Sequence, residues 1–311
     1  MRKETSSESF WIINQGIKKC PCRFNSSNSL YNNIKEKEIL CKICKNYFHL
    51  KCMRYFFLNK KRNFGKAHSI FECPSCFIKD QDPLSKPQKI LIEPFLIKNK
   101  INYEFFMTDE DKKLLFSKEK DYYIEIRCLK LGEYTHSHIR FPDQADVNLN
   151  NIKIKTFKKM EKCVSKNLRG DSSLKISRNF EKKNIKFKNK LNFKFKNIYD
   201  NKNTKKETKP IYIGFVALCR ELEIDELHSK IVKDNVLRKN EILEIAKQKF
   251  NSDMITVQII SKICPITGMT VQTPVRGEEC PHFDPIDLKS LIMTMKNNLT
   301  RYWKCLRCGA R

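Results

Sequence analysis

Residues 264–311 have the sequence CPITGMTVQTPVRGEECPHFDPIDLKSLIMTMKNNLTRYWKCLRCGAR. Within it, Cys280-Pro-His282 and Cys305-Leu-Arg-Cys308 are separated by twenty-two residues. Three thiolates and one imidazole at this spacing make a complete tetrahedral shell for a structural zinc ion. The sequence therefore predicts a zinc finger in this segment.

The residues between the two ligand pairs predict a helix. Asp284 is expected at its N-cap, Pro285 at its first position, and Asp287 near the positive end of the helix dipole. The residues expected to face inward are Leu288, Leu291, Ile292 and Met295. Metal and helix together then fix two loops against one another.

This string resembles the zinc finger of SP-RING (Siz/PIAS-type) SUMO-protein ligases. The matching features are Cys264-Pro265, Pro274-Val-Arg-Gly277, the Cys-x-His pair, Asp287 and Trp303-x-Cys-x-x-Cys. The resemblance implies a RING-like fold in which one zinc is bound by Cys280, His282, Cys305 and Cys308. It also implies a SUMO transferase of the RING type, with no nucleophile and no covalent intermediate on this chain.

In this family the finger binds the SUMO-charged conjugating enzyme and orients its thioester for attack by a substrate lysine. On the family pattern, Pro265 and Ile266 in the first loop and Leu306 in the second contact the conjugating enzyme. Leu306 stands where the family has proline, and Pro285-Ile-Asp stands where it has a cysteine before Phe-Asp. The segment that follows the finger in relatives does not follow Arg311, so we expect activity that is weak or depends on a partner.

Eight further ligands fall in order between residues 17 and 80, with Phe71 two residues before the seventh. Their spacing resembles a PHD finger. The resemblance implies one zinc on Cys20, Cys22, His49 and Cys52, and another on Cys41, Cys44, Cys73 and Cys76. Three zinc ions are therefore expected in the chain.

Tyr47 occupies the position where methyl-lysine readers place an aromatic cage wall. Several lysines surround the same groove, where a basic histone tail would need acidic groups. The sequence therefore favours a structural or other protein-binding finger over a methyl-lysine reader.

The middle of the chain has the alternating pattern of strands. Residues 122–128 place Ile124, Ile126 and Cys128 on one face, and 211–218 form a continuous apolar run. Residues 186–196 place Phe187, Leu191, Phe193 and Phe195 opposite a row of lysines. That strand has either a half-buried face with solvated lysines or a nucleic-acid-binding face. The region weakly resembles the PINIT domain that precedes SP-RING fingers.

The predicted fold class is α+β, in four segments. These are a small PHD-type zinc finger at 17–80, a linker at 81–89, a β-rich PINIT-like domain at 90–250 and a RING-like SP-RING (MIZ-type) finger at 251–311. A Lys/Asn-rich insertion is expected around 151–210. Helices are expected at 221–232, with Leu227 inward, and from Asn240 onward, with Ile242 inward.

The chain has 62 Lys and Arg against 35 Asp and Glu, a formal charge of +27. Such a charge indicates nucleic-acid or acidic-protein partners, or simply solvated lysines. No apolar run approaches the roughly twenty residues that span a bilayer, and no apolar signal core follows Met1. We therefore expect a soluble intracellular protein with its cysteines on zinc and no membrane contact, and the resemblance to SUMO-protein ligases implies the nucleus.

Two classes of function remain from the sequence. The first is a SUMO-protein ligase with the conjugating enzyme, SUMO and protein substrates as partners, and a histone tail or DNA as further candidates. The second is a non-catalytic chromatin-associated zinc-finger scaffold. A ubiquitin ligase is a rival within the first class.

Overall fold

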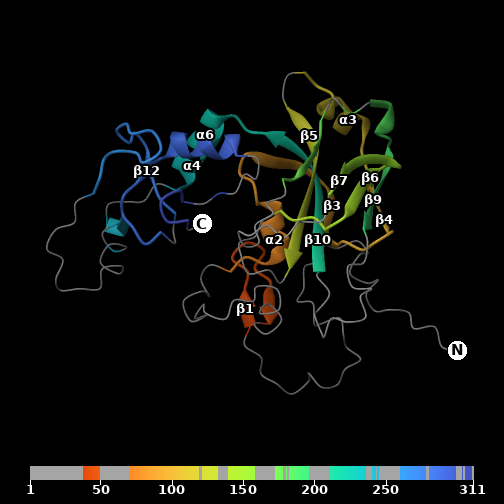
Figure 1. Cartoon of the computed structure of the whole chain (residues 1–311), viewed down its shortest axis with the longest axis horizontal. Helices are drawn as coiled ribbons and strands as arrows, with labels where there is room; N and C mark the ends of the chain where they lie inside the picture. Colours follow the sequence, from red (N-terminus) through yellow and green to blue (C-terminus); the bar gives the residue numbers. More distant parts are fainter. Residues whose placement is uncertain are drawn as a thin grey trace, which may run out of the picture. The chain divides into compact units, whose positions relative to one another are not determined.

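The structure is a computed structural model of the chain. It describes residues 38–49, 71–118, 121–131, 139–157, 172–177, 180, 182–195, 211–235, 240–242, 244, 260–277, 280–298, 303 and 305–309. The chain forms two compact units, one of Met1–Gln81 with Pro87–Arg220 and one of Asp82–Lys86 with Glu221–Arg311. We call them the sheet unit and the finger unit (Figure 1). In the described part of the chain, no helix has the length and apolar character needed to cross a membrane.

Two four-stranded sheets form the centre of the sheet unit, so the predicted α+β, β-rich class is confirmed. The first sheet has the order β3-β10-β5-β8, with β3 at Ser85–Leu96, β10 at Ile211–Glu221, β5 at Tyr122–Leu131 and β8 at Leu174–Ile176. The second is antiparallel with the order β4-β9-β6-β7, with β4 at Asn102–Phe106, β9 at Lys188–Phe195, β6 at Ala145–Leu149 and β7 at Ile152–Thr156. A helix, α3 (Asp109–Leu115), and a 3-10 turn, η5 (Lys182–Asn184), connect strands.

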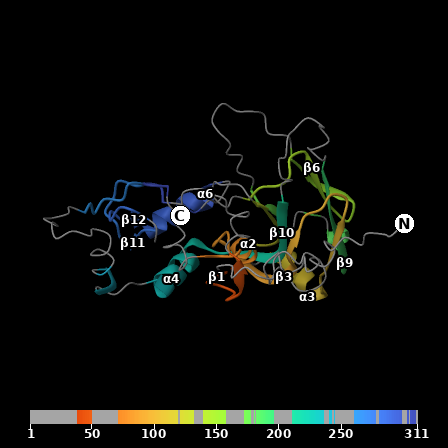
Figure 2. The same ribbon diagram turned by 90° about the horizontal axis from the view of Figure 1, so that it is seen from below.

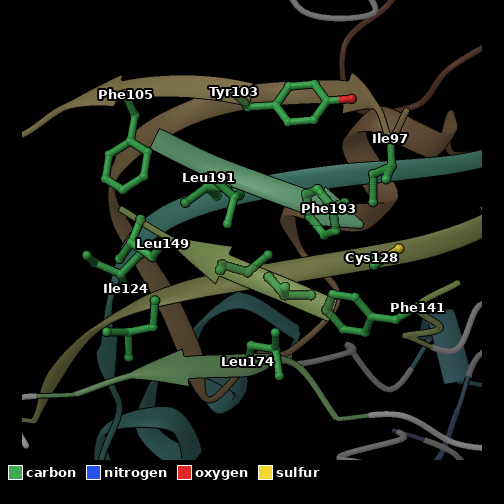
Figure 3. Packing of buried hydrophobic residues seen from close by; sticks show 14 of the residues in the cluster. Ile97, Tyr103, Phe105, Ile124, Cys128, Phe141, Leu149, Leu174, Leu191 and Phe193 are labelled. Carbon is green, nitrogen blue, oxygen red and sulfur yellow. The ribbon is translucent and has the colours of Figure 1, made fainter. Parts of the chain in front are cut away.

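The inward faces of both sheets contribute to one apolar core (Figure 3). Alternation places Ile124, Ile126 and Cys128 of β5 in it, as predicted, together with Leu191 and Phe193 of β9. Each of these five side chains is at most 1% exposed. The predicted half-buried strand at 186–196 is therefore present, although Phe187 lies outside it and is 59% exposed.

Strand β10 is buried on both faces, which explains its continuous apolar sequence. Its other face carries Phe215 and Cys219, which pack against Phe77 and Ile78 of α2 (Pro74–Lys79). On the core side, a Cβ at Gly214 would lie 2.5 Å from Cζ of Phe95. Glycine is thus required there for the Phe95 ring to pack on the strand.

A buried ion pair fixes α2 to the first sheet. Arg127 and Glu125 are both fully buried, and Nη2 of Arg127 lies 2.8 Å from Oε2 of Glu125. The same guanidinium donates hydrogen bonds to the carbonyl oxygens of Ile78 and Lys79 at the end of α2. Cationic groups are favourable at a helix C-terminus, so α2 ends on a charge that the sheet supplies.

The finger unit is built around two helices. They are α4 (Ile224–Asn235) and α6 (Leu288–Asn297), with the short strands β11 (Pro274–Val275) and β12 (Ile286–Asp287) beside them (Figure 2). Leu227 of α4 packs with Leu288 and Ile292 of α6. Met295 is also fully buried, and Leu291 packs on the neighbouring cysteine cluster. The inward faces predicted for both helices are therefore correct.

Three other predictions differ from the structure. Residues 81–89 are not a free linker, because Leu84 is fully buried with Leu222 and Leu227, and β3 begins at Ser85. Helix 224–235 packs in the finger unit and not in the β-rich domain predicted to extend to residue 250. Ile242 is 48% exposed, so the helical residues there do not bury it.

The Lys/Asn-rich segment around 151–210 is only partly an insertion. Strands β7, β8 and β9 fall inside it and supply strands to both sheets. Alternating apolar residues in these strands outweigh their lysines, because the lysines can stay in solvent while the apolar side chains enter the core.

Candidate metal centres

Four predicted ligands come together in the finger unit. The ligand atoms of Cys280, His282, Cys305 and Cys308 all lie within 4.8 Å of one another. Zinc with Zn–S bonds of about 2.3 Å requires sulfur–sulfur edges of about 3.8 Å. The Sγ atoms of Cys308 and Cys280 are 3.7 Å apart. The donor set and the spacing therefore fit a tetrahedral zinc ion.

The imidazole of His282 is oriented for ligation through Nε2. Its Nδ1 lies 3.0 Å from the carbonyl oxygen of Asp284, which can only accept a hydrogen bond. Nδ1 thus carries the proton and Nε2 keeps its lone pair, 3.2 Å from Sγ of Cys305. Such outer hydrogen bonds fix the tautomer and the ring orientation of a metal-bound histidine.

The two best-buried thiols of this cluster differ in acidity. Burial, with contacts to Cys305 and Cys308, raises the pKa of Cys280 to about 12. Burial also acts to raise the pKa of Cys305, but backbone hydrogen bonds from Cys308 and Arg307 and a contact with His282 outweigh it and lower this pKa to about 7. A dication is needed to keep both thiols deprotonated at neutral pH, which zinc supplies.

Two arginines connect the loops around this cluster. Nη1 of Arg276 lies 3.1 Å from the carbonyl oxygen of His282 and 3.3 Å from that of Cys280. Nη2 of Arg307 lies 2.9 Å from Oδ2 of Asp284. Arg276 is the arginine of the Pro-Val-Arg-Gly string, so its role in the string is to hold the Cys-Pro-His loop.

Residues 305–309 form a tight turn, and two other segments of the described residues have the same hydrogen bond and the same positive φ at the fifth residue. The Gly309 N–H donates to the Cys305 carbonyl at 2.8 Å, and Gly309 has φ of 73°. The Gly268 N–H donates to the Cys264 carbonyl at 2.9 Å, with φ of 70°. At residues 41–45, the Lys45 N–H donates to the Cys41 carbonyl at 3.0 Å, with φ of 56°. We call these three turns knuckles.

The knuckle at 264–268 lies outside both four-ligand clusters of the described residues. Thr267 stands where the other two knuckles have their second cysteine, Cys44 or Cys308. Burial acts to raise the pKa of Cys264, but backbone hydrogen bonds from Asp287, Ile266 and Thr267 outweigh it and lower that pKa. Hydrogen bonds thus surround a sulfur that belongs to neither ligand cluster.

Asp287 connects this metal-free knuckle to α6. Its Oδ2 accepts hydrogen bonds from the N–H groups of Gln272 at 3.0 Å and Thr273 at 3.1 Å. Its Oδ1 accepts from Ser290 N at 3.1 Å and Oγ at 3.0 Å. Asp287 is therefore the N-cap of α6, and the predictions of Asp284 as N-cap and Pro285 as first helical residue were wrong. Helix α6 therefore begins at Leu288, later than predicted, because the Asp287 carboxylate bonds both the preceding loop and the first turn of the helix.

The predicted contact residues for a conjugating enzyme lie on the two knuckles of the finger. Pro265 is exposed and Ile266 is half-buried against the cluster that contains Cys264 and Cys305. Leu306 is 41% exposed. Because both knuckles pack on one cluster, their exposed apolar groups are held on a common rigid support.

A second four-cysteine cluster lies in the sheet unit. The sulfurs of Cys41, Cys44, Cys73 and Cys76 lie within 4.8 Å of one another, with Cys44 and Cys73 3.8 Å apart. The hairpin of β1 (Glu38–Leu40) and β2 (Tyr47–His49) carries the first pair, and Cys73 is the N-cap of α2. The small apolar cluster around it contains Ile39, Phe48 and Phe71, too few to support a fold without metal.

The remaining predicted ligands are not placed in this way. Cys20, Cys22 and Cys52 lie outside the described residues, and for His49 only the backbone is described. Tyr47 is 56% exposed on β2. Sequence reasoning did not assign roles to Arg276 or Asp82. The arginine sits in a quoted motif, whereas nothing in the local sequence marks Asp82.

Within the described residues, the C-terminal segment thus has one four-ligand cluster that fits zinc and a second knuckle that lies outside that cluster. Residues 260–311 match the MIZ/SP-RING zinc finger family, which confirms the prediction for this segment. No curated protein matches the chain. Among solved structures, it is similar to the S. cerevisiae SUMO E3 ligase SIZ1, with 18% identity, a TM-score of 0.45, and coverage of 73% of this chain and 78% of that one. It is also similar to the S. cerevisiae SUMO E3 ligase SIZ2, with 17% identity, a TM-score of 0.45, and coverage of 74% of this chain and 85% of that one.

Proposed function

We propose that this protein is a SUMO-protein ligase whose finger binds the SUMO-charged conjugating enzyme and promotes SUMO transfer to substrate lysines. The observation that carries the proposal is the pair of knuckles at 264–268 and 305–309, fixed on one cysteine cluster in a segment of MIZ/SP-RING sequence. Ile266 and Leu306 then form the apolar contact for the conjugating enzyme, with Pro265 shaping the first loop.

The rate gain in this proposal comes from orientation. A thioester fixed in a near-attack arrangement reacts faster because the entropy of alignment has already been lost on binding. The cysteines of the described residues outside the two clusters, namely Cys128, Cys219 and Cys264, are fully buried. A buried thiol does not reach a bulky thioester, so these residues support transfer without a covalent intermediate on this chain.

The amino-terminal cluster belongs to a PHD-type finger in this proposal. A third zinc is held by Cys20, Cys22, His49 and Cys52, and the finger docks a protein partner in the nucleus. The exposed ring of Tyr47 suits a methylated lysine, because aromatic rings attract quaternary ammonium groups, but the exposed Lys42 and Lys45 on the same hairpin favour a partner less basic than a histone tail. Native mass spectrometry of the full chain should count three zinc ions; two or four would contradict the ligand assignment.

A single-turnover assay tests the ligase function. The full zinc-loaded chain is mixed with SUMO-charged conjugating enzyme and a lysine acceptor, and thioester loss is followed with time. We expect Ile266→Ala and Leu306→Ala each to slow discharge about tenfold, because anchors at the centre of an interface contribute more than about 1 kcal/mol. Met293→Ala is the matched control, since Met293 is 47% exposed in the same unit but lies on α6.

The outcomes separate this function from its rivals. If the intact protein gives no stimulation, or the same stimulation after Cys305→Ala, the chain is not a ligase and the non-catalytic chromatin scaffold becomes the better interpretation. If it discharges ubiquitin from a ubiquitin-conjugating enzyme and leaves the SUMO thioester intact, it is a ubiquitin ligase. Equal losses in Met293→Ala and Leu306→Ala would argue against the contact surface.

A further inference from the structure

The outward face of the second sheet is a polar, lysine-rich surface. Its residues alternate along the strands with the core residues, so their side chains point away from the core. Its members, which we call the outer sheet face, are Asn102, Glu104 and Phe106 of β4, Lys188, Lys190, Asn192 and Lys194 of β9, Asp146 and Asn148 of β6, and Lys153 of β7. From Lys188 to Lys194 this face is roughly 20 Å long.

The outer sheet face has an excess of positive charge. Two carboxylates lie on it, and each is already paired: Glu104 with Lys188 at 2.7 Å, and Asp146 with Lys153 at 3.0 Å. Lys190 is 4.0 Å from Glu104, at the limit of an ion pair. Lys194, on the same face, and Lys100, next to it in the lining of the hollow, are both exposed. Lysines therefore outnumber acids, and the surface suits an anionic chain.

A hollow of about 750 Å³ lies at one end of this face. Its lining includes Lys100 and Lys194, the carboxylate of Asp146, which is paired with Lys153, and several asparagines, among them Asn102, Asn148 and Asn192. Nδ2 of Asn192 donates to Oδ1 of Asn102 at 3.0 Å. Lysine ammonium groups and amide side chains thus converge on one concave surface.

Two polar atoms in this lining have unused hydrogen-bonding capacity. Asn148 and Asn192 are direct cross-strand neighbours in the register of β6 and β9. Within the described residues, the buried Nδ2 of Asn148 and the buried Oδ1 of Asn192 have no hydrogen-bond partner. Buried polar groups ordinarily have partners. Because both atoms are shielded from solvent, they meet a base in the hollow only when the two amide side chains turn outward; together they then complement a nucleobase edge, which offers both a donor and an acceptor.

At the other end, two aromatic rings are exposed together. Phe106 is 52% exposed and Phe187 is 59% exposed, with ring centroids 5.6 Å apart. Both rings leave apolar surface in water, although the core is adjacent. Single-stranded bases stack on exposed aromatic rings that lie beside lysines. Each stacked base raises the affinity several-fold.

We propose that the outer sheet face binds single-stranded nucleic acid. The lysines contact the phosphates, the Phe106 and Phe187 rings stack a base, and the amides of Asn148 and Asn192 pair with a base edge in the hollow. A duplex fits less well because its bases are stacked inside, where these rings and amides do not reach them. An acidic peptide would use the lysines but not the aromatic pair. The proposal does not depend on ligase activity.

Fluorescence anisotropy on the full zinc-loaded chain tests the proposal. The probes are labelled single-stranded DNA and RNA of about 12 nucleotides, the same DNA as a duplex, and a poly-glutamate peptide. We expect the single strands to bind tightest, and the DNA and RNA arms show which sugar is preferred. Lys190→Glu with Lys194→Glu should weaken binding at least about tenfold. The slope of log affinity against log salt should also become shallower, by about 0.7 for each phosphate that a lysine no longer neutralises.

Two further variants separate stacking from charge. Phe106→Ala with Phe187→Ala should weaken single-strand binding about five- to tenfold while the salt dependence stays the same, because every lysine that neutralises a phosphate remains in place. Lys113→Glu with Lys118→Glu makes the same charge change at exposed positions on and just after α3 and should change affinity by less than about twofold.

Several results would overturn the proposal. Equal weakening by the α3 control would mean that net charge alone attracts the oligonucleotide. Tighter binding of the duplex or of poly-glutamate would assign the face to another partner. Unchanged affinity in the double phenylalanine variant, with an unchanged melting temperature to show that it folds, would exclude the stacking surface.

Discussion

The two knuckles of the finger, 264–268 and 305–309, have the same backbone and different contents. In each, the fifth residue donates to the carbonyl of the first and is a glycine with φ near 70°. In each, the backbone N–H groups of the third and fourth residues donate hydrogen bonds to the sulfur of the first residue. Only the knuckle at 305–309 lies in a four-ligand cluster.

The difference shows which part of a zinc knuckle the chain can build without metal. Hydrogen bonds to the first sulfur and a left-handed fifth residue suffice for the turn. What the metal adds is a connection between distant segments. At the knuckle of residues 264–268, Asp287 supplies that connection: its backbone N–H donates to the sulfur of Cys264, and its carboxylate joins residues 272–273, which follow the knuckle, to the start of α6.

The largest difference between the knuckles should appear when the first cysteine of each is removed. Cys305→Ala should release the finger zinc, because a structural site contributes about 10 kcal/mol of folding free energy and three ligands hold it poorly. Cys264→Ala should keep the zinc and cost about 1–3 kcal/mol, from the missing sulfur and the unpaired backbone donors. Native mass spectrometry and urea unfolding measure the two effects. Loss of zinc in Cys264→Ala would mean that this knuckle also holds metal.

The second test removes the carboxylate that takes the place of metal. Asp287→Ala should lower the free energy of unfolding of the finger unit by about 2–4 kcal/mol, because it leaves three backbone donors without a partner and removes the N-cap of α6. Urea unfolding of the zinc-loaded protein measures the loss. Asp225→Asn is the control: it changes an 80% exposed side chain paired with Lys289 and should leave stability unchanged. Equal effects would argue against the bridging role.

The sequence predicted the metal-holding knuckle far better than its metal-free counterpart. Cys305 and Cys308 are recognisable because tetrahedral zinc accepts few residue types at few spacings. Thr267 carries no such signal, since a threonine in a loop is compatible with many turns. The N-cap was misplaced for the same reason: Asp284 and Asp287 are equally good caps in sequence, and only the positions of Gln272 and Thr273 select Asp287.

Long-range packing explains the other differences. Leu84 is 138 residues from Leu222 in the sequence, yet the Leu222 N–H donates to the Leu84 carbonyl at 2.8 Å. Prolines and polar residues around Leu84 predicted a linker because local composition contains no information on that distant partner. By contrast, the alternation in β5 and β9 predicted their core faces correctly, since a period of two depends only on the strand itself.

A smaller effect tests whether the two backbones are truly alike. Gly268→Ala and Gly309→Ala should each cost about 1–2 kcal/mol, because a Cβ is disfavoured at positive φ. Among the described residues, apart from the glycine's own chain neighbours, no atom lies within 4 Å of the added Cβ at either site, so the cost is conformational and should be equal. Asparagine, which tolerates this conformation better, should recover part of the loss at both positions. Urea unfolding measures both series, and unequal losses would mean that the two turns differ.

The smallest expected effect concerns the hydrogen bond between Trp303 and Asp82, which lies next to the knuckle at 305–309. Two residues before Cys305, Nε1 of Trp303 lies 3.4 Å from Oδ1 of Asp82, and Trp303 packs on the cluster of Leu84 and Leu288. Trp303→Phe keeps most of the packing and removes the hydrogen bond, so it should cost about 1 kcal/mol. A double-mutant cycle with Asp82→Asn isolates the pair, and coupling near zero would show that packing alone joins the segment 82–86 to this knuckle. A measurable coupling would mean that a finger expressed from residue 251 onward lacks part of its own support.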